Sequence, residues 1–240
     1  LGARLPAWKG KAPARPQLAA AKPRLGTVFF VHVKDAAQSS IYVGHPGPRR
    51  QDADYEATDL MMEILGGSFS SRINMNLRED KHWAYGAGAF VQNTRGQRPY
   101  LVFAPVQTDK TKESVQEIVK EVNAFVGEKQ MTQAEFDKTK QNTVLGTAGM
   151  WETNAAVNNS ARTIVKYGLA DDYWKTYSNK VQTLTLKDVQ NVAKTIVQPG
   201  NLGWFMAADA AKTMPGLQQL GLEVIQIDAE GKVVSKKPKP

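Results

Sequence analysis

The chain has three histidines, His32, His45 and His82, and no cysteine, and these residues limit its metal and nucleophile chemistry. None of the histidines lies in an H-E-x-x-H or inverted H-x-x-E-H spacing, which places two zinc ligands and a general base on one helix face. We expect a structural role for His32, inside an apolar β-branched run, and a turn at His45, which precedes a proline. Without cysteine there is no thiol nucleophile, no disulfide and no thiolate-bound metal.

The glycine motifs that serve other chemistries are incomplete. The segment Gly66-Gly-Ser-Phe-Ser70 lacks the final glycine of a G-x-S-x-G nucleophile elbow. The segment Gly86-Ala-Gly88 lacks the third glycine of a dinucleotide-binding fingerprint, and no phosphate-binding P-loop occurs. The sequence therefore predicts that this chain does not contain a complete active site.

The elements that must position any functional residue can be predicted from the hydrophobic pattern. Apolar, β-branched runs predict strands at 27–33, 39–43, 84–92, 100–106, 202–208 and 222–227, with the first two adjacent. Helical spacing and capping signals predict helices at 52–65, 70–79, 115–126, 153–168 and 172–183, and others that begin near 132 and 185. Strands in pairs with helices between the pairs predict an α+β fold, with a mostly antiparallel sheet and helices packed on it.

The net charge of +8 lies at the two ends of the chain. Residues 1–25 hold six basic and no acidic side chains, and residues 229–240 hold four basic side chains and one acidic. Residues 26–228 carry 21 basic and 22 acidic side chains and are close to neutral. We therefore expect a Pro-, Ala- and Lys/Arg-rich linker at 1–25, one domain at 26–228 and a basic tail at 229–240.

Length and composition exclude several classes of protein. At 240 residues and 42% hydrophobic content the chain can bury a core. The sequence contains no run of 18 apolar residues, so it predicts no transmembrane helix. Because position 1 is Leu and no signal peptide follows, we expect the chain to begin partway along a longer or processed polypeptide. The basic ends raise the alternative of nucleic-acid or anionic-lipid contact, but solvated linkers are the simpler expectation.

The segment from Leu60 to Tyr85 resembles the C-terminal-type domain of the pitrilysin/insulinase family of zinc metallopeptidases, which includes the mitochondrial processing peptidases. The order of elements from 27 to 209 is similar as well, including Met131-Thr-Gln-Ala-Glu135 after the long helix. The matching motifs are Leu65-Gly66-Gly67, Ser70-Ser71-Arg72, Leu77-Arg78-Glu79 and Ala84-Tyr85.

The resemblance implies a partner for this chain. In that family, similar domains occur in tandem, and two halves close like a clamshell around an unfolded peptide. The inverted zinc motif belongs to the first-type domain, so we expect no cofactor in this chain and Zn²⁺ in a catalytic half, either fused or a separate subunit. This chain would then be a non-catalytic, substrate-binding part of a zinc peptidase, inactive alone.

The resemblance also assigns the candidate site residues. In the family's non-catalytic half, an Arg and a Tyr seven residues apart reach the zinc site, and Arg78 and Tyr85 have that spacing. A guanidinium and a phenol can both donate to a peptide carbonyl and to the oxyanion formed from it. Without the resemblance, Arg78 is a helix-end ion-pair or capping residue and Tyr85 a half-buried core residue.

The chain departs from the family pattern just before Tyr85. The family often has Gly-Leu where this chain has His82-Trp83, so the turn that aims Tyr85 is expected to differ. His82 either adds a polar contact to substrate or is an exposed turn residue.

Two other functions stay open alongside the leading hypothesis. Relatives of this fold serve as scaffold subunits in respiratory complexes, which predicts an inactive assembly subunit as the alternative. Binding of nucleic acid by the basic ends ranks third. Because bacterial members with similar domains are often exported, the expected location is the periplasm.

Overall fold

The computed structural model describes residues 13–14, 19–22, 24–50 and 54–237, with side chains described as far as residue 235. Most of the linker expected at 1–25 therefore lies outside the described residues. A seven-stranded sheet has the order β3-β4-β2-β5-β1-β6-β7. Its strands are β1 (Thr27–His32), β2 (Gln38–Pro46), β3 (Gly88–Val91), β4 (Pro99–Gln107), β5 (Gly203–Ala208), β6 (Glu223–Ile227) and β7 (Val233–Lys237).

Four of the six strand pairings are antiparallel, and β1 pairs in parallel with β5 and with β6. The mostly antiparallel α+β fold predicted from the sequence is thereby confirmed. The prediction that 27–33 and 39–43 are adjacent strands is wrong, because β5 lies between β1 and β2. A short link between two strands leaves room for a third strand, and β5 hydrogen-bonds to both of its neighbours.

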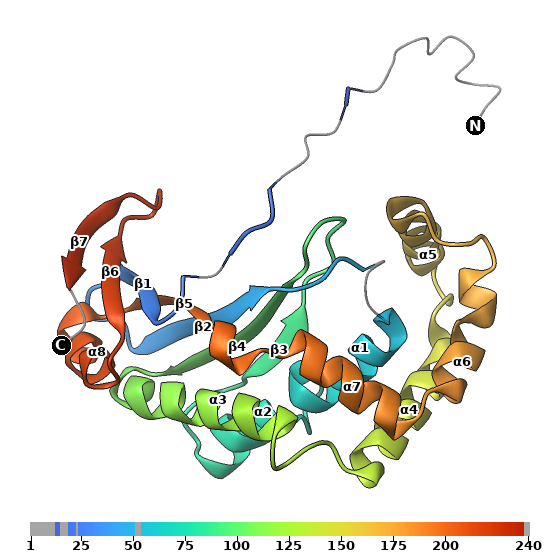
Figure 1. Cartoon of the computed structure of the whole chain (residues 1–240), viewed down its shortest axis with the longest axis horizontal. Helices are drawn as coiled ribbons and strands as arrows, with labels where there is room; N and C mark the ends of the chain where they lie inside the picture. The colour runs from blue at the N-terminus through green and yellow to red at the C-terminus, as the bar shows by residue number, and fades with distance from the viewer. Residues whose placement is uncertain (1–12, 15–18, 23, 51–53, 238–240) are drawn as a thin grey trace.

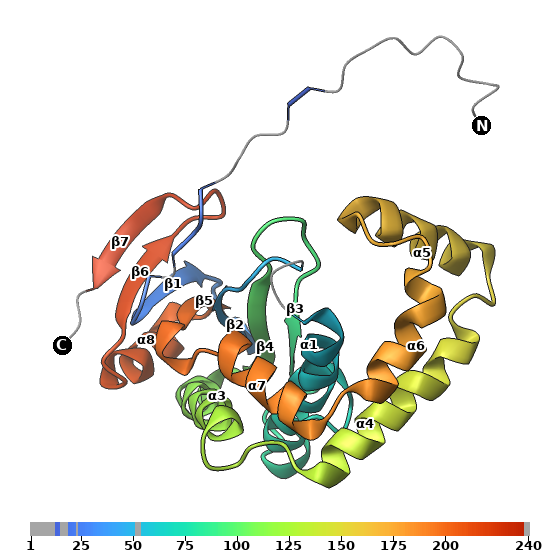
Figure 2. The ribbon, with the colours of Figure 1, turned by 45° about the vertical axis from the view of Figure 1, so that its right-hand side comes forward.

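Helices cover one face of this sheet, and Figures 1 and 2 show α1, α3 and α7 on the same side of the strands. The helices are α1 (Tyr55–Met62), α2 (Arg72–Asn74), α3 (Thr111–Val126), α4 (Gln133–Gly146), α5 (Asn154–Tyr167), α6 (Tyr173–Thr183), α7 (Leu186–Ile196) and α8 (Ala210–Gln219). Two π-helices, η2 (Glu63–Gly67) and η3 (Met75–Asp80), continue α1 and α2. Along the central strands β1, β2, β4 and β5, alternate side chains point to the helices, as β geometry requires. These buried residues include Val28, Phe30, Ile41, Val43, Val102, Ala104, Trp204 and Met206.

The opposite face of the sheet carries a row of aromatic side chains, and no helix in the described part of the chain covers it. Phe29 is in register with Phe205, Phe205 with Tyr42, and Tyr42 with Phe103, so one aromatic residue from each of four neighbouring strands lies in the row. Tyr42 and Phe205 are each 42% exposed, and Phe90 on the edge strand is 37% exposed. We call this surface the open face. A contiguous exposed apolar surface of this kind marks a binding site more often than a free surface.

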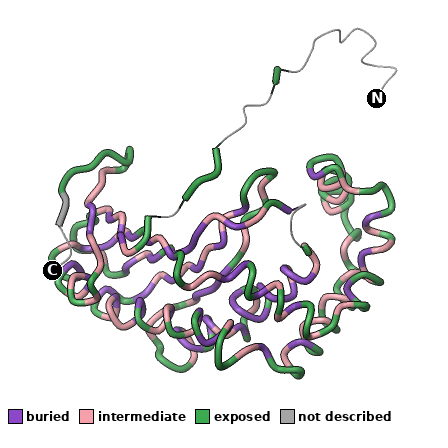
Figure 3. Tube along the Cα trace, viewed as in Figure 1, coloured by how far each residue is buried: buried purple, intermediate pink, exposed green. Residues whose placement is uncertain are grey.

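Two parts of the chain rise at the ends of the open face. The β6–β7 hairpin stands at one end, and the segment α4–α5–α6 stands at the other, with α5 farthest from the helical layer (Figures 1 and 2). Figure 3 shows that α5 is mostly exposed or intermediate, with Tyr167 its one buried residue. Within the described residues, no helix is both long and apolar enough to cross a lipid bilayer.

Two elements are not predicted by the sequence, and His45, expected at a turn, lies inside strand β2. Helix α8 contains Pro215 followed by Gly216, which is why the hydrophobic pattern does not predict it, yet the Asp209 carboxylate caps its first turn by accepting from the Ala211 N–H. Residues 233–237, placed in the basic tail, form β7 and pair with β6. The tail's two valines, Val233 and Val234, supply the β-branched residues that favour a strand.

Helix α1 and its continuation η2 reach the edge strand through a close backbone contact at Gly66. A Cβ at this position would lie 1.9 Å from the Ala89 amide nitrogen and 2.6 Å from the Ala89 Cα. Both are backbone atoms of β3 and have no freedom to rotate away. Glycine is therefore required where η2 contacts the sheet.

Arg72 and Glu135 join the start of α2 to the start of α4. The guanidinium donates from Nε and Nη2 to the two carboxylate oxygens, at 2.8 Å each, and Nη2 also donates to the Gln130 carbonyl. Glu135 completes the capping box of α4 by accepting from the Thr132 N–H. Burial raises the pKa of the Glu135 carboxyl, but the hydrogen bonds from Arg72 and Thr132 outweigh burial and hold that pKa at about 2.

We predict that Gly66→Ala lowers the free energy of unfolding by about 3 kcal/mol, because the new methyl overlaps backbone that cannot move aside. Urea unfolding monitored by circular dichroism measures the change. Gly146→Ala is the matched control: a Cβ at the end of α4 meets nothing within 4 Å, so this variant should be neutral or slightly stabilising. Equal stability of the two variants would contradict the contact described.

A second prediction concerns acid stability. Because the folded pKa of Glu135 lies below its ordinary value of 4.5, its stabilising contribution is complete above about pH 4.5 and is lost as the pH falls toward 2. Glu135→Gln should therefore be less stable than the parent protein at pH 7, and the difference should shrink over that window in urea titrations. Glu128→Gln, which removes an exposed carboxylate outside this contact, is the control and should leave stability at pH 7 unchanged. A pH-independent difference for Glu135→Gln would exclude the mechanism.

Candidate functional site

Arg78 is held at the surface by the packing of its helix. In α2 and η3 the side chains of Ile73 and Leu77, each 1% exposed, anchor the segment in the core. Arg78 follows Leu77, and its side chain is 32% exposed. Its Nε lies 3.2 Å from the Glu79 carboxylate, which is itself 38% exposed, so this ion pair contributes little to stability.

Tyr85 has a fixed backbone and a free side chain. The Trp83 N–H donates to the Leu77 carbonyl at 2.9 Å, and the Gln107 N–H donates to the Trp83 carbonyl at 2.9 Å. Ala84 forms an isolated antiparallel bridge with Val106, beside the end of β4. After this anchorage, Tyr85 is 84% exposed, so its phenol faces solvent. The sequence-based alternative of a half-buried core tyrosine does not describe this residue.

The turn between Arg78 and Tyr85 depends on His82. Its φ is +57°, in the left-handed region that glycine favours, and its backbone N–H donates to the Arg78 carbonyl at 3.1 Å. The His82 Nδ1 lies 3.1 Å from the same carbonyl oxygen. The histidine therefore adopts a conformation typical of glycine at a cost of about 1 kcal/mol. Its ring is exposed, and its contact with substrate stays a prediction.

Phe69 joins the predicted pair and is not singled out by the sequence. The Arg78 guanidinium carbon lies 4.6 Å from the centre of the Phe69 ring and 5.3 Å from that of the Tyr85 ring. Phe69 is 61% exposed, although a large apolar side chain is normally buried. The only signal for it in the sequence is an aromatic residue soon after the Gly66-Gly67 helix stop. We call Phe69, Arg78 and Tyr85 the Arg78 cluster.

Asn74 fixes the two segments on either side of the Arg78 cluster. It is 4% exposed, its Nδ2 donates to the Phe69 carbonyl at 2.7 Å, and its Oδ1 accepts from the Ala87 N–H at 3.1 Å. A pocket of about 430 Å³ adjoins the cluster. Its lining includes Phe69, Asn74, Tyr85, Phe103 and Pro105. Because Phe103 also belongs to the aromatic row, the pocket connects the Arg78 cluster to the open face.

The Arg78 cluster offers hydrogen-bond donors at an exposed, partly aromatic surface. A guanidinium presents several N–H groups and a phenol one O–H, so both can bind a carbonyl, a carboxylate or an oxyanion. Within the described residues, no group of three or more His, Asp or Glu side chains could hold a metal ion. The residues in the described part of the chain therefore do not fit a zinc site.

The other two histidines make structural hydrogen bonds. His32 Nδ1 accepts from the Ala210 N–H at 3.1 Å, at the start of α8. His45 is 5% exposed, and its Nε2 accepts from the Gln198 N–H at 3.3 Å. Burial lowers the pKa of His45, which favours the neutral ring that can accept this bond.

Comparisons with known proteins agree on one family. Residues 3–143 match the model of the peptidase M16 inactive domain. A curated relative, the "Non-peptidase homolog YmxG" of Helicobacter pylori (strain ATCC 700392 / 26695), is 25% identical over 210 residues, which are 85% of this chain and 46% of the relative.

Two solved structures are similar in fold. The peptidase M16 inactive domain of Pseudomonas fluorescens has a TM-score of 0.75 at 19% identity, over 85% of this chain and 48% of that one. A Yersinia pestis protein described as a predicted insulinase family protease has a TM-score of 0.67 at 17% identity, over 91% of this chain and 50% of that one. The chain thus spans about half the length of each of these three relatives.

The family match, the sheet with helices on one face and the motifs from Leu65 to Tyr85 agree with one another. The resemblance drawn from the sequence is confirmed: the chain belongs to the family of peptidase M16 inactive domains.

Proposed function

We propose that this chain is the substrate-binding, non-catalytic half of a zinc peptidase, and that Arg78 and Tyr85 contact a peptide carbonyl opposite a partner's zinc site. The observation that carries the proposal is the Arg78 cluster itself: one exposed and one partly exposed donor, held by a fixed backbone, beside a pocket that opens onto the aromatic sheet face. Membership of an inactive-domain family within the peptidases supports it. The half-length match to relatives leaves room for a catalytic half.

The open face supports contact with an unfolded peptide. Extended peptides present side chains at regular spacing, and the aromatic row offers apolar contacts along the sheet from Phe29 to Phe103. A peptide that lies on this face reaches Tyr85 through the pocket that Phe103 shares with the cluster. The open face supplies binding area, and the cluster supplies polar contacts at one bond of the peptide.

Each side chain of the pair has a separate role in this proposal. Arg78 is the anion and carbonyl ligand, and the Phe69 ring next to its guanidinium limits the positions it can take. Tyr85 donates a hydrogen bond from its phenolic O–H. Substrate can reach this group because the residue is 84% exposed. The zinc ion and its general base belong to the partner half.

We also propose a periplasmic location, which rests on the family resemblance alone. Fractionation of the source cells, followed by detection with an antibody to this chain, tests it.

We predict that Arg78→Ala and Tyr85→Phe each lower turnover of a quenched fluorescent peptide on the order of 10²-fold in the complex with the zinc-bearing half, because each removes one oxyanion donor. The KM should change less than kcat, since the loss falls mainly on the transition state. Both variants should unfold at the temperature of the parent protein, because both side chains are at the surface.

Lys81→Ala is the control for this test, since it removes an exposed cation three residues from Arg78 without touching the cluster. It should leave turnover unchanged. Parent-like turnover of both Arg78→Ala and Tyr85→Phe would refute the assigned roles.

A second candidate function is an inactive assembly subunit, and the description of the Helicobacter pylori relative as a non-peptidase homolog favours it. In that case the Arg78 cluster is a contact surface for another subunit. The complex with the zinc-bearing half would then form normally but show no peptide cleavage, and Phe69→Ala would weaken its assembly in analytical ultracentrifugation.

A further inference from the structure

A second cavity, of about 750 Å³, lies away from the Arg78 cluster, at the α5 end of the molecule. It is lined by α5, by the turn between β3 and β4, and by residues just before and at the start of α1. Figures 1 and 2 show α5 opposite that turn and α1. Four of its lining residues are cationic, namely Arg50, Arg95, Arg162 and Lys166, and none of its described lining residues is acidic. We call it the Arg50 pocket.

The floor of the Arg50 pocket is a rigid stack of an arginine on tyrosines. Arg50 is 6% exposed, and its guanidinium carbon lies 3.4 Å from the ring centre of Tyr55 and 4.5 Å from that of Tyr167. Its Nη2 donates to the Tyr173 hydroxyl at 3.1 Å. The aromatic faces hold the buried Arg50 guanidinium in one geometry. The carboxyl of Asp59 also interacts with this guanidinium, so a ligand meets the positive charge mainly at the exposed cations of the walls.

A hydrogen bond joins two walls of the pocket, and two of the wall cations are exposed. Lys166 on α5 donates from Nζ to the Asn93 carbonyl in the β3–β4 turn at 3.1 Å. Arg95 in that turn and Arg162 on α5 are both exposed. The cations thus come from three separate parts of the chain and surround one volume.

A neighbouring cavity is lined mostly by carboxylates among its charged residues. It measures about 560 Å³, shares Tyr55 and Asn93 with the Arg50 pocket, and includes Asp59, Glu63 and Glu135 together with one cation, Lys138, in its lining. An extended ligand across both cavities therefore meets cations on one side of Tyr55 and mostly carboxylates on the other. This polarity selects a ligand with its acidic part in the Arg50 pocket.

The dimensions and charge of the pocket narrow the ligand class. A volume of about 750 Å³ exceeds what one inorganic anion fills and suits a ligand of several groups. Cations on three segments suit several carboxylates rather than one. A nucleic acid would need a longer basic track, whereas residues 26–228 are close to neutral overall.

We propose that the Arg50 pocket binds an acidic stretch of polypeptide, with two or more Asp or Glu side chains. The proposal rests on the proposed function for its choice of a peptide ligand, and it names a substrate class: peptides with an acidic segment at a distance from the bond held at Tyr85. The aromatic rings of Tyr55, Tyr167 and Trp174 in the lining add apolar contacts beside the charges.

The test is a fluorescence anisotropy titration of the 240-residue chain with a labelled peptide that carries four Glu residues spaced by Gly and Ala. We expect saturable binding that weakens as salt is raised, and a peptide with Gln at the four positions should bind much more weakly. Arg95→Gln with Arg162→Gln should weaken binding of the Glu peptide about tenfold, because two exposed cations are lost.

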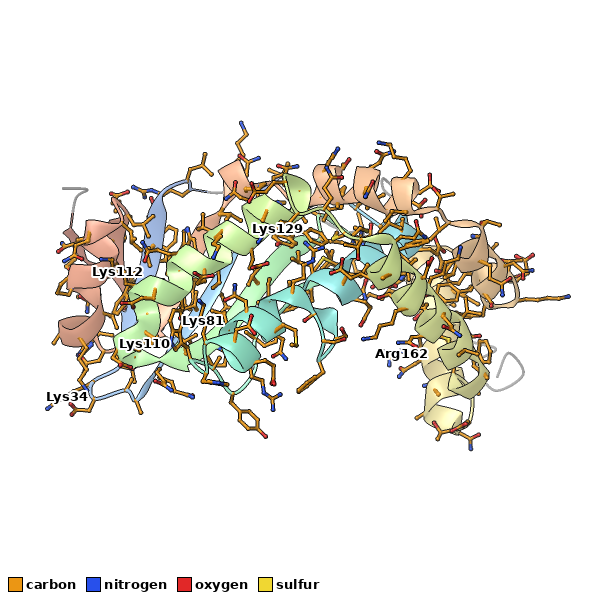
Figure 4. All side chains as sticks on the ribbon, turned by 90° about the horizontal axis from the view of Figure 1, so that it is seen from below. Lys34, Lys81, Lys110, Lys112, Lys129 and Arg162 are labelled. Carbon is orange, nitrogen blue, oxygen red and sulfur yellow. The ribbon has the colours of Figure 1, made fainter. Side chains whose placement is uncertain are left out.

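Lys110→Gln with Lys112→Gln is the matched control, since it removes the same charge at the start of α3, far along the molecule from Arg162 (Figure 4). It should leave the affinity unchanged. Equal loss in the control pair, equal affinity for the Gln peptide, no saturable binding, or tighter binding of oligothymidylate would each overturn the proposal. Because the titration needs no catalytic half, its result is independent of the cleavage test at Arg78 and Tyr85.

Discussion

The position of the candidate site depends on one close contact between two backbones, that of Gly66 in η2 and that of Ala89 in the edge strand β3. Because no side chain separates them, the end of the first helix lies directly on the strand that begins the sheet. Phe69 follows this contact after three residues, and Asn74 then hydrogen-bonds to the Phe69 and Ala87 backbones. Arg78 and Tyr85 are thus positioned by a series of contacts that begins at Gly66, where the absence of a Cβ allows the two backbones to touch.

The sheet separates two kinds of hydrophobic residue by simple alternation. Residues such as Ile41 and Val43 face the helices and are fully buried, whereas Tyr42 between them faces the other side. The same period repeats in β4 and β5, so the aromatic row and the core come from one sequence pattern. The aromatic side chains of the open face are therefore separate from the core.

Much of the fold, and part of the candidate site, follow from local sequence, because apolar periodicity locates most strands and helices. The position of β5 between β1 and β2 could not be predicted, since strand order depends on contacts between residues far apart in the chain. Helix α8 could not be predicted because Pro215 disfavours a helix, and packing overrides this local preference. Spacing and resemblance identify Arg78 and Tyr85, but the place of Phe69 beside them depends on contacts across separate segments. The left-handed backbone of His82 is likewise a conformation that composition would not assign to histidine.

The parallel pairing of β1 has a mechanical consequence. The chain ahead of Thr27 enters the sheet at an internal strand, which hydrogen-bonds to β5 on one side and to β6 on the other. A force applied along β1 to the chain just ahead of Thr27 shears both ladders, and all the hydrogen bonds of β1 to β5 and β6 resist it together. An edge strand pulled from its end would instead open one bond at a time. A force on the chain just ahead of Thr27 is therefore shared between β5 and β6, and the sheet resists it better than it would at an edge strand.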